Sequence, residues 1–159
     1  MGELSHVDAT GAARMVDVTD KAATARVAVA SGLVLTTSEV VELLRSNGLK
    51  KGDALSTARI AGIMGAKRTS DLVPLCHPIP ISGVTVDFVL EDAAIRVSAT
   101  VRTSGQTGVE MEALTAVTVA GLTIHDMIKA VDPAAVLSEV RLDRKEGGKA
   151  GVWTRPEGR

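Results

Sequence analysis

One long apolar segment most constrains how this chain can fold. Residues 109–131 repeat apolar side chains at three- and four-residue steps, the period of an α-helix with one buried stripe. The members of the stripe are Leu114, Val117, Gly121, Ile124, Ile128 and Val131. Asp132-Pro133 ends the run, because a proline disfavours helical backbone at the residue before it. We predict one long helix whose stripe packs on a sheet.

Alternating apolar residues predict the strands of that sheet. Glu91-Asp92-Ala93 joins two alternating segments and predicts a hairpin turn. Ser31-Gly32 separates two shorter segments and predicts a strand, a turn and a second strand. The predicted strands are residues 26–30, 33–35, 84–90, 95–101 and 136–142.

Two shorter helices have recognisable ends. Residues 36–39 supply capping side chains ahead of the first helix, and Asn47-Gly48 ends it. Asp53 is the predicted N-cap of the second helix, which extends towards Lys67-Arg68. Three prolines exclude regular structure from residues 74–80. Strands joined by hairpins and long connections, with helices on one face, predict an α+β sandwich.

The chain predicts one domain with an irregular segment at each end. Its 159 residues, 45% of them hydrophobic, are enough to close a single core. We interpret residues 1–20 as an N-terminal arm, residues 21–146 as one α+β domain and residues 147–159 as a flexible tail. Because Phe88 and Trp153 are the only aromatic residues, small side chains dominate the surface, which favours completion by a second copy of the chain.

Charge and cysteine content exclude several classes of protein. Eighteen basic and nineteen acidic residues lack the basic excess expected of a nucleic-acid-binding protein. Cys76 is the single cysteine, which excludes an intrachain disulfide and a cysteine cluster for a metal, and favours a reducing cytoplasm. The histidines show no metal-ligand spacing. No stretch approaches the ~20 apolar residues of a membrane span, and no signal peptide precedes the domain.

Charged residues on a second face of the long helix are candidates for catalysis. At ~100° per residue, Glu112, Asp126 and Lys129 share a side with small and apolar residues, so we expect this face not to be solvated. Such surroundings shift pKa values towards catalytic use. The alternative is an Asp126–Lys129 pair on a wet surface, and spacing alone favours this alternative.

Four other segments carry groups suited to an anionic nucleotide. His77, between prolines, could bind a phosphate or move a proton, and a histidine satisfied by a backbone carbonyl is equally compatible. The glycine-bearing residues 103–108 could cradle an anion at a helix N-terminus. Residues 110–112 could hold a guanidine-like edge, or favour the helix dipole. Lys50-Lys51 and Lys67-Arg68 supply cations, although such runs are usually solvated surface.

Together these motifs resemble the cyclic pyranopterin monophosphate synthase family, also called molybdenum cofactor biosynthesis protein C. The resemblance covers residues 4–151. The matching motifs lie at residues 15–18, 51–53, 57–63, 66–69, 75–78, 107–115, 122–124, 126–127, 129–131 and 147–149.

The resemblance implies a ferredoxin-like antiparallel sheet with helices on one face, in a homohexamer built as a trimer of dimers with active sites at the dimer interfaces. It implies a lyase of molybdopterin biosynthesis that converts 3′,8-cyclo-7,8-dihydroguanosine 5′-triphosphate, made by a radical enzyme upstream, to cyclic pyranopterin monophosphate and pyrophosphate. It implies no redox cofactor, and leaves open whether Mg²⁺ accompanies the triphosphate.

The resemblance also implies roles for individual residues. It places catalysis on Asp126, Lys129 and Lys51, and it gives His125 no role. The implied substrate-binding residues are Leu75, Cys76, His77, Glu110, Met111 and Glu112, with secondary contributions from Asp17, Arg26 and Lys67. A non-catalytic nucleotide-binding paralogue or sensor and an assembly scaffold are the alternatives. An inactive relative would be expected to lack one of the catalytic residues or His77, and all are present.

Overall fold

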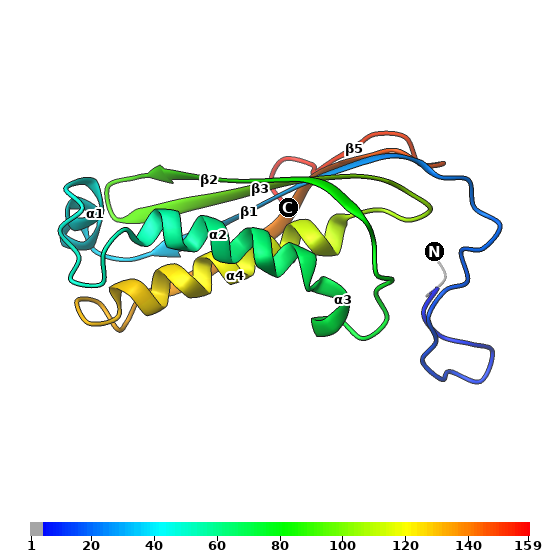
Figure 1. The fold of residues 1–159 in the computed structure, drawn as a ribbon, viewed down its shortest axis with the longest axis horizontal. Coiled ribbons are helices and arrows are strands. Elements are labelled where there is room, and N and C mark those ends of the chain that lie inside the picture. The colour runs from blue at the N-terminus through cyan, green and yellow to red at the C-terminus, as the bar shows by residue number, and fades with distance from the viewer. Residues whose placement is uncertain (1–4) are drawn as a thin grey trace.

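The computed structural model describes residues 5–159, which form one five-stranded antiparallel sheet with helices on one face (Figure 1). The elements are β1 (Thr24–Leu35), α1 (Ser38–Arg45), α2 (Ala54–Lys67), α3 (Thr69–Leu72), β2 (Ile81–Leu90), β3 (Ala94–Gly105), α4 (Glu110–Ile128), β4 (Val136–Glu146) and β5 (Trp153–Thr154). The strand order is β2-β3-β1-β4-β5, so β1 lies at the centre. The predicted α+β fold is confirmed.

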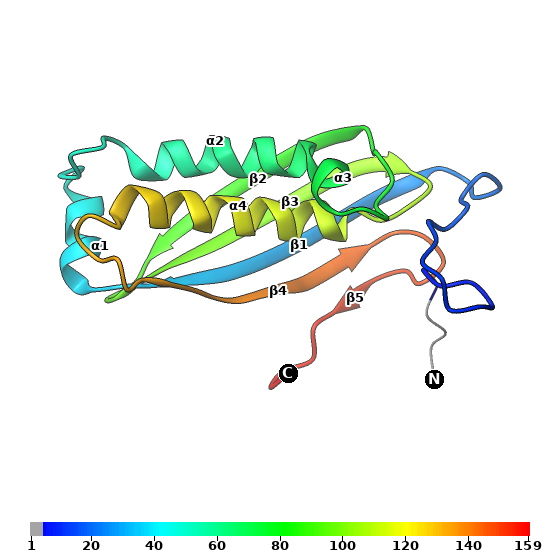
Figure 2. The same ribbon diagram turned by 90° about the horizontal axis from the view of Figure 1, so that it is seen from below.

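The long helix α4 packs beside α2 against the sheet, as the apolar stripe predicts (Figure 2). Val117, Ile124 and Ile128 are fully buried in the core between these layers. Val131, the last member of the predicted stripe, is 41% exposed because the helix ends at Ile128. Gly62 lets the two helices approach closely, since a Cβ atom there would lie 2.9 Å from the Ala116 carbonyl oxygen.

The prediction of a turn at Ser31-Gly32 is wrong. Strand β1 continues through both residues and pairs with β3 on one side and β4 on the other. A Cβ atom on Gly32 would lie 2.9 Å from Cγ1 of Val117, so the glycine accommodates α4 rather than a turn. The neighbouring β4 shifts register opposite this point and places Glu139 at a φ of 51°.

Local end signals of the helices are confirmed. The Thr37 hydroxyl accepts a hydrogen bond from the Val40 N–H, and the Asp53 carboxylate accepts one from the Ser56 N–H at 2.9 Å. The predicted hairpin is also present as β2 and β3. The loop expected over residues 103–108 is shorter, because β3 continues to Gly105 in register with β1. Helix α3 was not predicted.

The two terminal segments lie outside this core. Residues 5–23 contain a single isolated bridge, between Val7 and Ala13, and residues 153–154 form β5 on the edge of β4. Strand β5 lies within the segment predicted as a tail. The division into arm, domain and tail stays a prediction. Of the helices within residues 5–159, none has the length and apolar character needed to cross a bilayer.

Candidate active site

A cavity of about 370 Å³ opens at the N-terminal end of α4. The segment after α3, the β3–α4 loop, the first turn of α4 and the end of β4 contribute to its walls. Six of the predicted substrate-binding residues line it together: Leu75, Cys76, His77, Glu110, Met111 and Glu112. Side chains separated by more than thirty positions in the sequence therefore share one concave site.

The histidine-bearing loop of this cavity is tied down at both ends. The Cys76 N–H donates to the Val73 carbonyl, which closes a tight turn just before His77. The Thr103 hydroxyl on β3 donates to the Pro80 carbonyl, which fixes the other end of the loop to the sheet. The sequence prediction of a stiff loop that presents His77 agrees with this arrangement.

The carboxylates of the cavity lie in two different environments. The Lys145 ammonium contacts Oε1 of Glu110 at 3.0 Å, so this carboxylate is paired. Glu112 is only 3% exposed, and burial, with a contribution from the charge of Glu110, raises its pKa. Burial and the same two glutamates also raise the pKa of the Cys76 thiol, which keeps it protonated and unreactive as a nucleophile.

The predicted catalytic residues form a second cluster at the C-terminal end of α4. The Asp126 carboxylate contacts the Lys129 ammonium at 2.7 Å and the Lys51 ammonium at 3.0 Å. Lys51 also donates to the Asp126 carbonyl at 2.9 Å. Hydrogen bonds from Lys129 and then Lys51, reinforced by their charges, lower the pKa of Asp126 to about 2.

The expectation of an unsolvated face is wrong for this cluster in the single chain. The Asp126 and Lys129 side chains are each 54% exposed, and they form the i,i+3 surface pair that spacing alone favours. Of the three charged residues predicted on this face, Glu112 alone is buried, and it lies at the other end of the helix. The sequence pattern placed the three residues on one side but did not reveal that this side is covered at one end only.

The cavity and the Asp126 cluster are far apart in one chain. Asp126 lies fourteen positions after Glu112, which at 1.5 Å per residue is about 21 Å along the helix. Figure 2 shows α4 extending from the end near α3 to the end near α1. Catalytic groups act within hydrogen-bond reach of the reacting atoms. A single chain therefore cannot apply both groups of residues to the same substrate atom.

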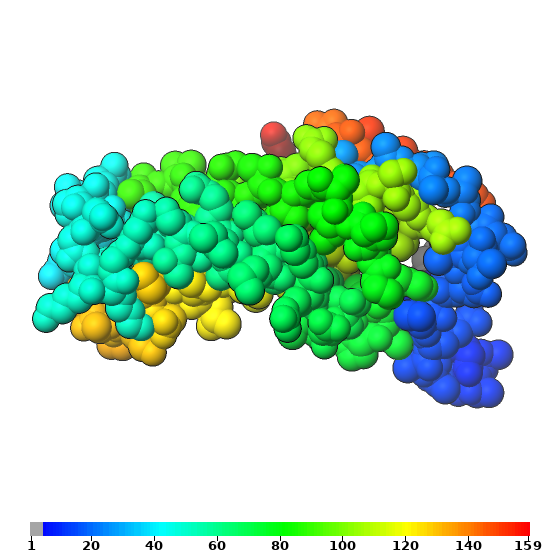
Figure 3. All heavy atoms as spheres, in the orientation of Figure 1, coloured from blue at the N-terminus to red at the C-terminus, as the bar shows by residue number. Residues whose placement is uncertain are grey.

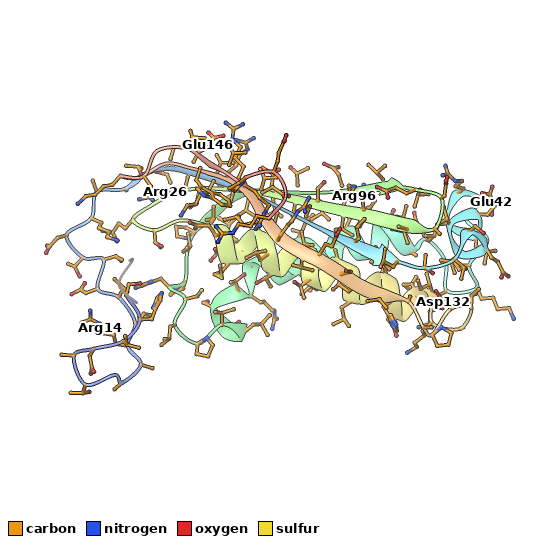
Figure 4. All side chains as sticks on the ribbon, turned by 180° about the vertical axis from the view of Figure 1, so that it is seen from behind. Arg14, Arg26, Glu42, Arg96, Asp132 and Glu146 are labelled. Carbon is orange, nitrogen blue, oxygen red and sulfur yellow. The ribbon has the colours of Figure 1, made fainter. Side chains whose placement is uncertain are left out.

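Arg26 lines a smaller adjoining cavity of about 150 Å³ together with Lys145 and Lys149. Figure 4 shows Arg26 and Glu146 at the same end of the molecule, away from Asp132. The buried Nε of Arg26 has no hydrogen-bond partner among residues 5–159. Glu110 and Lys145 belong to both cavities, so the two are neighbours.

Asp17 and Lys67 lie outside both cavities. Hydrogen bonds from Thr19 lower the pKa of Asp17, and the charge of nearby His77 adds to this effect, so Asp17 lies close to the rim of the larger cavity. Lys67 is the exposed last residue of α2. The structure therefore places Asp17 near the site and leaves Lys67 beside neither cavity.

Thr107, which lines the larger cavity, belongs to the predicted anion-binding segment 103–108, whereas sequence reasoning gave no role to three other lining residues: His6, Lys145 and Lys149. Lys145 lies beyond the predicted end of the last strand, which continues to Glu146. A longer predicted strand would have included Lys145 and would have indicated its place beside the cavity. His6 lies in a segment without periodicity. Within residues 5–159, no three metal-binding side chains come together as an ion would require.

Comparison with known protein families matches residues 15–148 to the MoaC family. The chain belongs to the MoaC family. A Streptomyces coelicolor protein named cyclic pyranopterin monophosphate synthase is 64% identical over 152 residues, covering 96% of this chain and 89% of that protein. A Mycobacterium tuberculosis protein named cyclic pyranopterin monophosphate synthase 2 is 60% identical over 154 residues, covering 97% and 92%. A Nocardioides synthase of the same name as the first is 59% identical, covering 96% of each chain.

The part of this MoaC chain matched to the family contains both groups of charged residues. The cavity residues from Leu75 to Lys145 and the cluster at Lys51, Asp126 and Lys129 all lie within residues 15–148. His6 and Lys149 lie outside that range. The matched range therefore includes every residue of the predicted site, while two of the additional lining residues lie outside it.

Proposed function

We propose that this chain is a cyclic pyranopterin monophosphate synthase. It converts 3′,8-cyclo-7,8-dihydroguanosine 5′-triphosphate to cyclic pyranopterin monophosphate and pyrophosphate in molybdenum cofactor biosynthesis. The observation that carries the proposal is one cavity lined by six predicted substrate-binding residues in a MoaC-family chain. Relatives that bear the name of this activity are 58% to 64% identical over nearly the whole chain.

The cavity suits the base of this substrate. Carboxylates hold guanidine-like N–H edges through paired hydrogen bonds, and Glu110 and Glu112 lie in one turn of α4 beside the thioether of Met111. Phe88 and Trp153 are the only aromatic residues of the chain, and neither lines the cavity. Hydrogen bonds and aliphatic contacts, instead of stacking, therefore recognise the base.

The phosphate chemistry requires cations next to the cavity. A sugar hydroxyl attacks the α-phosphorus and loses its proton, while the bond to pyrophosphate breaks and charge gathers on the leaving group. Arg26, Lys145 and Lys149 provide positive charge in the adjoining cavity. His77 lines the larger cavity, where an imidazole is suited to accept the hydroxyl proton.

The chief role of Asp126 is to position Lys51 and Lys129. A carboxylate whose pKa is about 2 is ionised at neutral pH and is a weak base. It can hold the Lys51 and Lys129 ammonium groups in fixed positions at 3.0 and 2.7 Å. The lysines then supply the protons and positive charge for ring opening and re-closure, and the carboxylate orients them.

The complete site forms between two copies of the chain. A two-fold axis across the middle of α4 would bring the C-terminal cluster of one copy to the cavity of the other, which overcomes the separation of about 21 Å. Large apolar side chains exposed on α2 and α4 support an interface on this face: Ile60, Met64 and Leu122 are 54% to 65% exposed. The proposed assembly is a homohexamer, a trimer of such dimers.

Mixing two inactive variants tests the shared site. Asp126→Asn removes the C-terminal cluster and His77→Ala alters the cavity, so each should lose activity alone. After unfolding and refolding together, half of the dimers are mixed and carry one intact site, so about a quarter of wild-type activity should return. Mixtures that stay inactive, with mixed dimers demonstrated by mass spectrometry, would place the whole site within one chain.

The fold is proposed to be ferredoxin-like. The order of elements supports this classification, because β1, the α2 region, β2, β3, α4 and β4 follow a strand–helix–strand–strand–helix–strand sequence. The sheet order β2-β3-β1-β4 places the first and third strands at the centre. The extra edge strand β5 and the short helices α1 and α3 are additions to that arrangement.

The remaining features follow from the proposed reaction. No redox step occurs, so no resident redox cofactor is proposed, and Mg²⁺ would enter with the triphosphate as part of the substrate. A radical enzyme upstream supplies the cyclised nucleotide. The enzyme is proposed to work in the cytoplasm, without nucleic-acid or membrane partners, which the net charge of −1 supports.

Pyrophosphate release is the decisive test of the proposed function. The purified protein, supplied with the cyclised dihydroguanosine triphosphate, should form pyrophosphate and cyclic pyranopterin in equal amounts, and Asp126→Asn should form neither. Tight binding of the substrate without either product would identify a non-catalytic sensor instead. Absence of binding would leave the scaffold alternative.

A further inference from the structure

One side chain of the N-terminal segment reaches the larger cavity. Among residues 5–23, His6 lines that cavity, in company with His77, Glu110 and Lys145. Figure 3 shows the N-terminal segment, in blue, against the green surface formed near α3 and the segment that follows it. His6 lies outside the family match at residues 15–148, and the proposed function gives it no role.

A compact turn holds the backbone at His6. The Asp8 carboxylate accepts hydrogen bonds from the Thr10 hydroxyl at 2.6 Å, the Thr10 N–H at 2.8 Å and the Ala12 N–H at 3.0 Å, which lower its pKa. Across the turn, the Arg14 N–H donates to the His6 carbonyl at 2.9 Å. The histidine is therefore presented by a closed turn and does not lie on a frayed end.

The segment after this turn is docked beside the same cavity. The Gln106 side-chain N–H donates to the Thr19 carbonyl at 3.3 Å, which ties the segment to the β3–α4 loop. Asp17 lies close enough to His77 for the two charges to interact. Val18 lines a separate cavity together with His77 and its neighbouring prolines. These contacts place His6 and His77 on two segments that lie against each other.

The cavity needs donors that its internal ion pair does not supply. Lys145 is already engaged by Glu110 at 3.0 Å, and Glu112 adds a second carboxyl group. An anionic, carbonyl-bearing nucleotide entering this space requires N–H donors, which His77 and His6 can provide. An imidazole on the N-terminal segment would also cover the substrate from the solvent side.

We propose that His6 is a substrate-binding residue and that residues 6–17 act as a strap over the cavity. The His6 imidazole donates a hydrogen bond to an oxygen atom of the nucleotide-derived substrate. This inference rests on the proposed synthase function. It adds a residue from outside the matched range, and it makes Asp8 a positioning residue that acts through His6.

Steady-state kinetics on matched variants test the strap. His6→Ala should raise KM about tenfold with kcat changed less than about twofold, because a bond made equally to substrate and transition state affects binding alone. His6→Gln keeps an N–H donor and should recover part of the loss. Ser5→Ala, next to His6 and outside the cavity, is the control and should match the wild type.

A double-variant comparison separates positioning from general damage. Asp8→Ala should raise KM through His6, so Asp8→Ala combined with His6→Ala should be no worse than His6→Ala alone. Additive effects would overturn the positioning role of Asp8. An unchanged KM in His6→Ala would overturn the proposal as a whole.

Histidine resonances distinguish failure of this inference from failure of the proposed function. The chain has three histidines, so the ring signals of isotope-labelled protein can be assigned with His6→Gln. Titration of the cyclised triphosphate into the non-reacting Asp126→Asn variant should shift the His6 signal to saturation. Turnover by the wild type with an unmoved His6 signal overturns the strap. A shifted His6 signal without wild-type turnover overturns the synthase and leaves the strap as part of a binding site.

Discussion

The carboxyl groups at the two ends of α4 have pKa values shifted in opposite directions. At the N-terminal end, Glu112 is 3% exposed and burial raises its pKa. At the C-terminal end, Asp126 is 54% exposed, and two lysines lower its pKa to about 2. Burial disfavours a charged carboxylate, and ammonium partners favour it. The environment of Glu112 therefore favours the protonated carboxyl group, and the two lysines beside Asp126 favour the ionised carboxylate.

The largest expected effect comes from removing the charge at the exposed end. Asp126→Asn should lower turnover at least ~100-fold, because the two lysines lose the group that positions them. The midpoint of thermal unfolding should stay close to that of the wild type, since exposed ion pairs contribute little to stability. Pyrophosphate release and thermal unfolding measure the two quantities. Asp92→Asn, in the exposed hairpin turn, is the control and should alter neither.

A loss of folding in Asp126→Asn would contradict this assignment. It would show that the cluster supports the structure of the helix end, and the contrast with Glu112 would then concern stability instead of catalysis.

Removing the charge at the buried end should give effects of opposite sign on stability and activity. Glu112→Gln keeps the shape and should raise the unfolding free energy by roughly 1 kcal/mol at neutral pH, because an ionised group no longer has to be buried. Turnover should fall about tenfold, since the amide cannot pair with a guanidine-like edge as a carboxylate does. Chemical unfolding and steady-state kinetics measure these changes.

The pH dependence gives the sign of the Glu112 effect independently. A folded-state pKa above the unfolded value means that the native state holds the proton longer, so stability falls as pH rises above the ordinary glutamate value of about 4.3. Glu112→Gln should remove this part of the decline. A variant that is less stable than the wild type across pH 5 to 8 would show that the ionised carboxylate is stabilised by contacts in the native protein.

Local sequence signals predicted much of the fold because they act within a few residues. The N-caps Thr37 and Asp53 and the 84–101 hairpin depend on neighbouring positions alone. The turn predicted at Gly32 was wrong because the glycine is needed to make room for Val117. That residue is distant in the sequence and comes close only when α4 packs on the sheet. A glycine carries no information on whether a turn or a neighbouring helix requires it.

The same limit applies to the candidate site. Helical periodicity placed Glu112, Asp126 and Lys129 on one side of α4, but exposure depends on what the rest of the fold lays over each end. Lys145 at the end of β4 and His6 in the N-terminal segment both reach the cavity, although each is distant in the sequence from the first turn of α4. Their contribution required the three-dimensional arrangement.

The smallest expected effect concerns how the two lysines share control of Asp126. Its pKa is lowered first by the Lys129 hydrogen bond and next by Lys51, so Lys129→Met should raise it more than Lys51→Met does. The lowered pKa means that the stabilisation is complete above about pH 3.9 and is lost as the pH falls through about 2, so neither variant should change stability between pH 5 and 8. Carbon-detected titration of the Asp126 carboxyl measures the shifts. A larger rise in Lys51→Met would show that the lysine from the α1–α2 loop, and not the one on α4 itself, sets the charge at this end of the helix.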